Sequence, residues 1–138
     1  MKRGLLKITV LGVFTALLLQ SCTDYTEEIK GKTSGFLDAY FNGDYEKAVT
    51  FCTDSLGGEI ASMLSGFELL DPSIKEMVKK QASSLTTEII SVEKSENRDT
   101  IMVNYKVILP YLPTGKDKTL SFVKEEKEWK VAKLGGDI

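Results

Sequence analysis

The sequence predicts an α+β fold in which N-terminal helices pack on one face of a curved, four-stranded antiparallel sheet. A change of period predicts it, because apolar residues recur with helical spacing up to about residue 84 and with a period of two from residue 86 onward. The composition agrees, since 42% hydrophobic and 28% charged residues are typical of an ordinary folded domain. We expect one domain over residues 27–138 of the 138-residue chain.

The first two predicted helices flank a turn. The first helix ends at Asn42-Gly43, a turn signal, and Asp44 then caps a short second helix that reaches Cys52. The apolar residues of the first helix share one face, which predicts that this face packs on the sheet. They are Ile29, Phe36, Leu37, Tyr40 and Phe41.

Two further helices complete the first half. Gly57-Gly58 is expected to separate the second helix from a third, which covers about Glu59 to Leu70. Asp71 followed by Pro72 predicts the start of a fourth helix, because Asp is a favoured N-cap and Pro suits the first helical position. This helix is expected to run to about Ser84.

The second half of the sequence is predicted to form four consecutive strands. Thr86–Lys94 and Thr100–Leu109 are the first two, with a turn at residues 96–99 between them. The second of these is the strongest, because apolar side chains alternate along its whole length. A loop is predicted next at Pro110, Pro113 and Gly115, followed by a closing hairpin of strands Lys118–Lys124 and Glu128–Leu134.

The N-terminus has the pattern of an export signal. A basic start (Lys2, Arg3 and Lys7) precedes the uncharged run Ile8–Leu19. Such a run suits the core of a signal peptide and falls short of the roughly 20 residues that span a bilayer. A buried helix at the start of the domain is the alternative, and the basic flank and terminal position speak against it. We therefore expect residues 1–21 to be removed as a signal peptide.

The stretch Leu19-Gln20-Ser21-Cys22 resembles the lipobox of bacterial lipoproteins, in which a small residue directly precedes an invariant cysteine. The resemblance implies cleavage after Ser21 and attachment of a diacylglyceryl thioether and an amide-linked fatty acid, such as palmitate, to Cys22. Two or three acyl chains anchor a protein stably, whereas one binds only weakly. Residues 22–26 would form a lipidated tether. The protein is expected in the bacterial cell envelope, anchored by lipid to the outer membrane and facing either the periplasm or the surface.

The residues after Cys22 bear on the destination. Thr23 stands where enterobacterial lipoproteins retained in the inner membrane carry Asp, so that retention signal is absent. The acidic cluster of Asp24, Glu27 and Glu28 resembles the surface-export signal of some Gram-negative lineages. The same acids also suit the first turn of a helix, where they interact favourably with its dipole. Both interpretations stay open.

The second cysteine is predicted to be inert. With Cys22 lipidated, Cys52 has no partner for an intramolecular disulfide. The chain has no His to activate the thiol, and the neighbours Phe51, Thr53 and Asp54 are not basic. We expect Cys52 to be buried on a helix.

The order of elements resembles the nuclear-transport-factor-two-like fold, a cystatin-like architecture. The motifs that carry the resemblance are Asn42-Gly43-Asp44-Tyr45-Glu46-Lys47-Ala48 after an opening helix and Glu128-Trp129-Lys130-Val131 in the closing strand. The chain is similar to small bacterial lipoproteins of that class with domains of unknown function. The resemblance covers roughly Glu27 to Leu134 and implies a cone, formed by the bent sheet around the helices and open at one end.

Composition excludes several kinds of site. Because the chain has no His, it lacks Ser/His and Cys/His nucleophile systems, His-based metal sites and an imidazole base. Removal of Lys2, Arg3 and Lys7 makes the chain more acidic than its net charge of −2, which disfavours nucleic acid. No Gly-rich loop lies between a strand and a helix. We expect no cofactor, no metal and no nucleic-acid partner.

Asp38 is the one acid that the resemblance makes interesting. In enzymes of this fold, an Asp inside the cone can pass a proton to and from a small apolar substrate. Here the apolar face of the helix places Asp38 on the far side, which predicts exposure to solvent. An isomerase or dehydratase using Asp38, Tyr40 and Tyr105 is the enzymatic alternative.

Aromatic residues supply the candidate ligand site. Tyr105 stands on the apolar face of its strand, and a buried phenol needs a hydrogen-bond partner. It is either a core residue bonded to backbone, which we favour, or a residue that faces a ligand. The Tyr111-Leu112 tip is expected to pack on its own sheet rather than to contact a partner. The candidate ligand-binding residues are Phe36, Tyr40, Tyr105, Phe122 and Trp129.

Together these observations predict a non-enzymatic envelope lipoprotein that binds a small apolar ligand or an envelope protein. The alternatives are the enzyme described above and a structural or assembly component whose outer sheet face docks an envelope complex.

Overall fold

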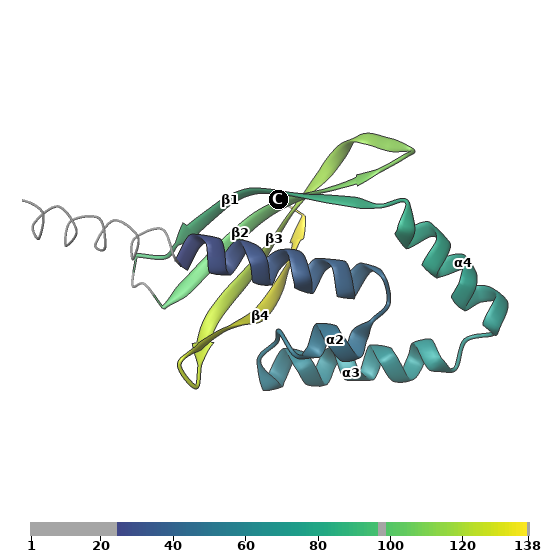
Figure 1. Ribbon diagram of the computed structural model, residues 1–138, viewed down its shortest axis with the longest axis horizontal. Helices are drawn as coiled ribbons and strands as arrows, with labels where there is room; N and C mark the ends of the chain where they lie inside the picture. Colours follow the sequence, from purple (N-terminus) through teal and green to yellow (C-terminus); the bar gives the residue numbers. More distant parts are fainter. Residues whose placement is uncertain (1–24, 97–98, 138) are drawn as a thin grey trace, which may run out of the picture.

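Helices followed by a four-stranded antiparallel sheet make up the fold, which confirms the α+β prediction (Figure 1). The computed structural model describes residues 25–96 and 99–137. The sheet has the order β1-β2-β3-β4, so each strand pairs with the next one along the chain. The predicted signal peptide and Cys22 lie outside the described residues.

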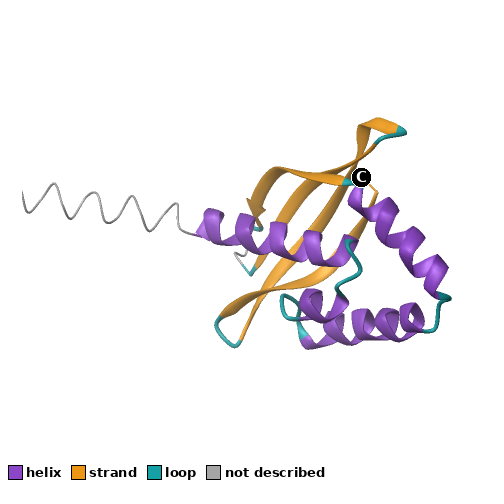
Figure 2. Ribbon diagram, turned by 45° about the vertical axis from the view of Figure 1, so that its right-hand side comes forward, coloured by secondary structure: helices purple, strands orange, loops and turns teal. Residues whose placement is uncertain are grey.

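The first helix covers residues 25–41 and lies across one face of the sheet (Figure 2). Its buried face includes Ile29, Phe36 and Leu37, as predicted. Thr33 is buried on the same face, and its hydroxyl donates to the carbonyl of Ile29 at 2.7 Å. Residues 25 and 26, which were expected to belong to the tether, are helical.

Helix α2 (Tyr45–Val49) begins as predicted, since the Asp44 carboxylate accepts a hydrogen bond from the Lys47 backbone N–H at 3.3 Å. It ends before Cys52, which corrects the expected position of that thiol: Cys52 is buried, but it is not helical. The reason is a short parallel bridge to β4. The Val131 N–H donates to the Phe51 carbonyl at 2.8 Å, and the Thr53 N–H donates to the Val131 carbonyl at 2.9 Å.

Helix α3 (Asp54–Glu68) contains Gly57-Gly58, so the prediction of a break at these glycines was wrong. Thr53 caps the helix, because its side-chain oxygen accepts from the Leu56 N–H at 3.3 Å. An added Cβ at Gly57 would lie 3.3 Å from Cγ1 of Val49. The glycine therefore lets α2 and α3 pack closely rather than ending a helix.

Helix α4 (Pro72–Ser83) begins as predicted, with the Asp71 side chain accepting from the Ser73 N–H. It connects the far end of α3 to the start of β1 (Figure 2). None of its residues is buried, and Met77 is 56% exposed.

The sheet buries one face. Strands β1 (Thr86–Lys94) and β2 (Thr100–Leu109) have the predicted bounds, and β3 (Leu112–Glu125) and β4 (Glu128–Asp137) complete the sheet. Alternate residues of β2, β3 and β4 face the first helix and form the core with it. These buried residues are Ile101, Val103, Tyr105, Val107, Leu120, Phe122, Trp129 and Val131.

Strand β3 begins earlier than predicted, so the expected loop at Pro110, Pro113 and Gly115 is mostly strand. Only residues 110 and 111 form the turn, and Leu109 pairs with Leu112. Strand β4 pairs with β3 only from Lys118 onward, so residues 112–117 form a local edge. Proline is tolerated at an edge because its missing N–H is not needed there.

Replacing Gly115 by alanine is expected to destabilise the domain by about 1–2 kcal/mol. Gly115 has φ +73° at the irregular pairing of β2 with β3, and an added Cβ would lie 3.1 Å from the Val107 carbonyl oxygen. Urea unfolding measures the effect. The control is Gly31→Ala in the first helix, where nothing lies within 4 Å of an added Cβ. Alanine at position 31 should raise the free energy of unfolding by about 0.5–1 kcal/mol. Equal effects at positions 31 and 115 would contradict the positive φ of Gly115 in the β2–β3 hairpin.

Candidate ligand site

The five predicted ligand-binding aromatics lie in or against the core beneath the first helix. Phe36 and Phe122 have no exposed surface, Tyr105 is 3% exposed and Trp129 is 8% exposed. Tyr40 is half-buried, and its ring stacks on Phe36 with the centroids 5.6 Å apart. Side chains thus fill much of the space that an open cone would leave for a ligand.

Tyr105 differs from the hydrogen-bonded core tyrosine that the sequence favours. Its hydroxyl makes no hydrogen bond within the described part of the chain, although every fully buried side-chain oxygen or nitrogen described there has a partner. The hydroxyl therefore keeps some access to water. Burial raises the pKa of Tyr105 to about 12, with a smaller contribution from the neighbouring Tyr40. The Tyr105 phenol is consequently neutral at physiological pH.

Asp38 lies on the exposed side of the first helix, as the sequence predicts. Its carboxylate accepts a hydrogen bond from the side-chain amide of Asn42 at 3.0 Å. It borders a hollow of about 250 Å³ together with Phe41 and Leu85. The structure does not bring Asp38 together with Tyr105 inside the core.

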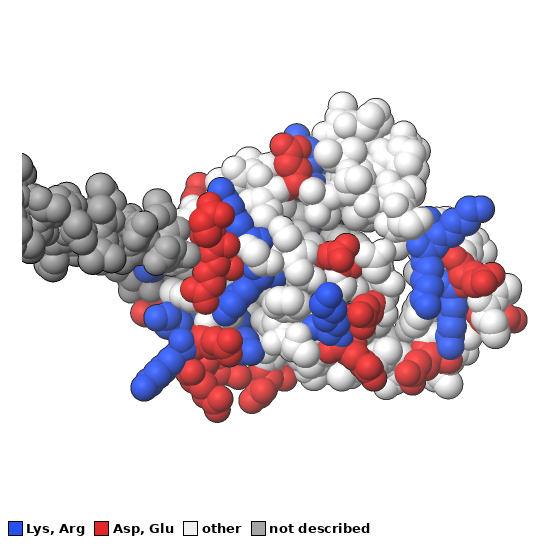
Figure 3. Space-filling model, viewed as in Figure 1, with Lys and Arg blue, Asp and Glu red and all other residues white. Residues whose placement is uncertain are grey.

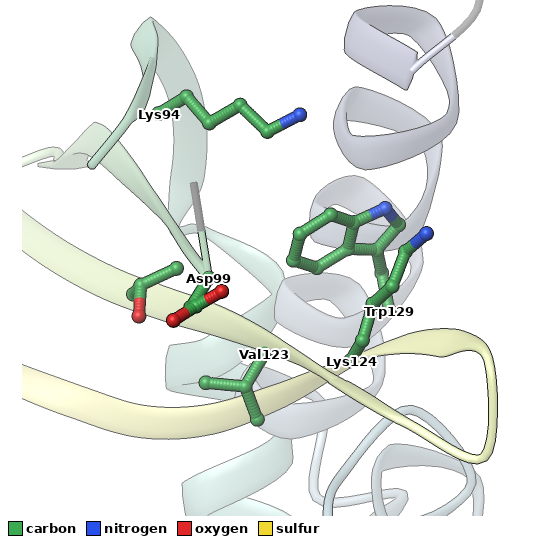
Figure 4. Close-up of a pocket in the computed structure, with 6 residues that line it drawn as sticks. Lys94, Asp99, Val123, Lys124 and Trp129 are labelled. Atoms are coloured by element: carbon green, nitrogen blue, oxygen red, sulfur yellow. The ribbon is translucent and has the colours of Figure 1, made fainter. Parts of the chain in front are cut away.

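A more open pocket, of about 390 Å³, lies beside Trp129. It is found at the end of the domain that holds the N-terminal part of the described first helix and the β3–β4 turn (Figure 1). Acidic and basic side chains are mixed at this end (Figure 3). We call it the Trp129 pocket; its lining residues are Lys94, Asp99, Thr100, Val123, Lys124 and Trp129 (Figure 4).

Two lysines converge on the indole of this pocket. The ammonium nitrogen of Lys94 lies 5.9 Å from the centroid of the Trp129 ring and 4.8 Å from that of Tyr25. The ammonium nitrogen of Lys124 lies 5.3 Å from the Trp129 ring centroid. In the part of the chain that the structure describes, neither lysine has a carboxylate within ion-pair distance. The aromatic faces hold both cations, and no carboxylate of the described residues neutralises them.

The opposite wall carries a negative charge. Asp99 lies across the hollow from the indole (Figure 4). Among the described residues its carboxylate has neither an ion pair nor a hydrogen bond. The pocket therefore offers two cations, one anion and an aromatic surface to a single small ligand.

The sequence interpretation named Trp129 but missed Lys94, Asp99 and Lys124. A signal for one lysine was present: Lys124 follows Leu120 and Phe122 at a period of two and so shares their inner face. The strand register then places Lys124 directly opposite Trp129. A lysine at the end of an apolar strand face is therefore a usable indicator of a polar pocket rim.

A second, more apolar hollow of about 470 Å³ lies between α4 and the β2–β3 hairpin. Its lining includes Phe41, Val78, Leu85 and Leu109. Tyr111 at the hairpin tip also borders it and is 82% exposed, so the prediction that this tip packs on its own sheet was wrong. The reason is the length of β3, which carries the turn beyond the body of the sheet.

The described residues carry neither a metal-ligand cluster nor a helix that could span a membrane. They hold no group of three or more Cys, Asp or Glu side chains suited to a metal ion. No helix within residues 25–96 and 99–137 is long and apolar enough to cross a membrane.

No protein-family model matches this chain, and no curated protein matches it. Among solved structures, the chain is similar to one from Campylobacter jejuni described as a "Putative NTF2-like transpeptidase". The two are 15% identical, with a TM-score of 0.48. The match covers 78% of this chain and 97% of the other.

Proposed function

We propose that this chain is a lipid-anchored protein of the bacterial cell envelope, held in the outer membrane through Cys22, whose α+β domain binds a small ligand without converting it. The basic start, apolar run and lipobox-like stretch support the anchor. The Trp129 pocket supports the binding role.

One observation carries the binding role: Lys94 and Lys124 both lie over the Trp129 ring without a carboxylate partner among the described residues. A ligand anion that reaches these ammonium groups would form charge-assisted hydrogen bonds worth about 1.5–3 kcal/mol each. The indole and Val123 offer apolar contact beside them. The ligand is therefore proposed to carry an anionic group, in contrast to the wholly apolar ligand expected from the sequence.

The candidate catalytic groups favour binding over catalysis. A proton-transfer group works best when its pKa lies near the operating pH. Burial raises the pKa of Tyr105 to about 12, far from neutrality. Asp38 is exposed and hydrogen-bonded to Asn42. An enzyme acting through these two groups would need them to meet in one cavity.

The Cys22→Ser variant should lose all incorporation of radiolabelled palmitate, because the thioether and the cleavage that follows both require the thiol. Labelling is measured on the protein immunoprecipitated from the host. The matched control is Cys52→Ser, which should keep full labelling because Cys52 is buried in the domain. Persistent label on Cys22→Ser would contradict the anchor.

Native mass spectrometry of the chain recovered in detergent from its own host tests the binding role. We expect a bound mass of a size that the Trp129 pocket can hold. The mass should disappear in a Lys94→Gln, Lys124→Gln double variant and persist in Lys79→Gln, Lys80→Gln, which removes two exposed lysines of α4. A protein without bound ligand would instead favour an envelope protein as partner. The exposed side chains of α4, together with Leu69 at 88% exposure, would then be the surface to test.

A further inference from the structure

We infer that the Trp129 pocket holds the phosphoethanolamine headgroup of a membrane phospholipid, with the phosphate on Lys94 and Lys124 and the ammonium on Asp99. This inference rests on the proposed function, because it assigns the ligand of the same pocket and uses the anchor at Cys22. Three features of the molecule lead to it: the charges inside the pocket, its distance along the chain from Cys22, and the charges around it.

The charges inside the pocket fit a dipolar ligand. The Lys94 and Lys124 ammonium groups lie on different sides of the indole, and the Asp99 carboxylate lies across the hollow from it (Figure 4). None of the three forms an ion pair with another described residue, so each can contact a ligand. A simple anion would leave Asp99 without a partner and close to a like charge. A ligand with both a phosphate and an ammonium group pairs with all three.

The pocket also lies close to the proposed anchor. Tyr25 contacts the Lys94 ammonium, with 4.8 Å from the nitrogen to the ring centroid. Cys22 precedes Tyr25 by three residues, which can span at most about 11 Å. The polar layer on each side of a bilayer is about 5–8 Å thick. The chain from acylated Cys22 to Tyr25, which contacts the Lys94 side of the pocket, is therefore short enough to hold the pocket beside the headgroup layer.

The charges around the pocket favour a headgroup without net charge. Glu27, Glu28, Glu96 and Glu126 are exposed around it, and so are Lys30 and Lys127. A rim of mixed charge gives no net attraction for an anionic membrane surface. A zwitterionic headgroup matches such a rim. Among zwitterionic headgroups, phosphoethanolamine has N–H groups that can donate hydrogen bonds to the Asp99 carboxylate, whereas phosphocholine has none.

Trp129 provides a direct reporter, because it is the only tryptophan of the chain and lines the pocket. The lipidated chain is purified in dodecyl maltoside, and its fluorescence is titrated with O-phosphoethanolamine, phosphocholine and inorganic phosphate. We expect phosphoethanolamine to bind most tightly. The Lys94→Gln, Lys124→Gln double variant should weaken binding of all three about tenfold or more, because it removes the charge-assisted bonds to phosphate.

The Asp99→Asn variant tests the contact with the ammonium group separately from the contact with the phosphate. It should abolish the preference for phosphoethanolamine over inorganic phosphate while leaving phosphate binding intact. The Lys79→Gln, Lys80→Gln variant of α4 is the matched control and should titrate like the wild type, since those lysines lie away from the pocket.

Vesicles distinguish a lipid from a soluble ligand of the same chemistry. Reconstituted into phosphatidylcholine vesicles with and without phosphatidylethanolamine, the protein should change its Trp129 fluorescence only when phosphatidylethanolamine is present. A response to free phosphoethanolamine without a response to these vesicles would contradict the claim that the ligand is a membrane phospholipid. Equal affinity for phosphate and phosphoethanolamine would overturn the headgroup assignment but leave the binding role standing. No response to any probe, together with no bound mass in native mass spectrometry, would overturn the proposed function itself.

Discussion

Replacing Phe36 by alanine should lower the free energy of unfolding by about 3–5 kcal/mol. The side chain has no exposed surface, stacks on Tyr40 with the ring centroids 5.6 Å apart, and belongs to the core that joins the first helix to the sheet. Its removal would leave a cavity that the helix cannot close without moving. Because a domain of this size has a total stability of about 5–15 kcal/mol, the loss is a large fraction of the whole.

Urea unfolding followed by circular dichroism measures the change. Tyr111→Ala is the control, because that aromatic is 82% exposed and its loss should change stability by no more than about 0.5 kcal/mol. The comparison also separates two roles for Phe36. A Phe36→Ala variant that unfolds like the wild type but loses a bound ligand would identify Phe36 as a ligand contact rather than a core residue.

The domain should also lose stability steeply at alkaline pH. Burial raises the pKa of Cys52 from 9.0 to about 11, an effect that Lys130 partly offsets, and raises that of Tyr105 from 10.0 to about 12. Both groups are neutral when protonated, and the folded state holds these protons more tightly than the unfolded state. The contribution of these two groups to the free energy of unfolding is therefore fully present below about pH 9. It falls as the two groups ionise in the unfolded chain, and it is lost as pH rises through 11 and 12. A two-unit shift corresponds to about 2–3 kcal/mol for each group.

Unfolding free energies measured at pH 8 and at pH 11 check this expectation. Tyr105→Phe and Cys52→Ala should each reduce the difference between the two pH values, and the double variant should reduce it further. Tyr111→Phe, which alters an exposed phenol, should leave the difference unchanged. An unchanged difference in Tyr105→Phe would mean that the Tyr105 hydroxyl is as well solvated in the folded state as in the unfolded one.

The sequence predicts the elements best where one local signal decides them. The bounds of β1 and β2 are correct because turn residues at 96–99 divide the two strands and buried residues alternate along β2. The start of α4 is correct because Asp71-Pro72 is a strong local cap. The start of α3 was missed because Gly57 is present for packing against Val49, a contact between helices that no local pattern reveals. The start of β3 was missed because Pro113 is acceptable only where β4 has not yet joined the sheet.

The candidate site was predictable only in part. Hydrophobic patterning identified Trp129 and placed it on the inner face. It could not reveal that Lys94 and Lys124 meet there, because this depends on the pairing of β1 with β2 and of β3 with β4. Irregular pairings shift both registers, one of them between Ser121 and Phe122. Each shift changes which residues face each other, and none of them has a distinct sequence signal.

The ammonium of Lys32 in the first helix donates to the Trp129 carbonyl of the last strand at 3.1 Å, across 97 residues of sequence. Cys52 and Val131 are joined across a similarly long stretch of chain. Contacts of such separation carry a high loop-closure cost and slow the folding reaction. The helices of the first half therefore cannot complete their core until β4, the last strand, is in place.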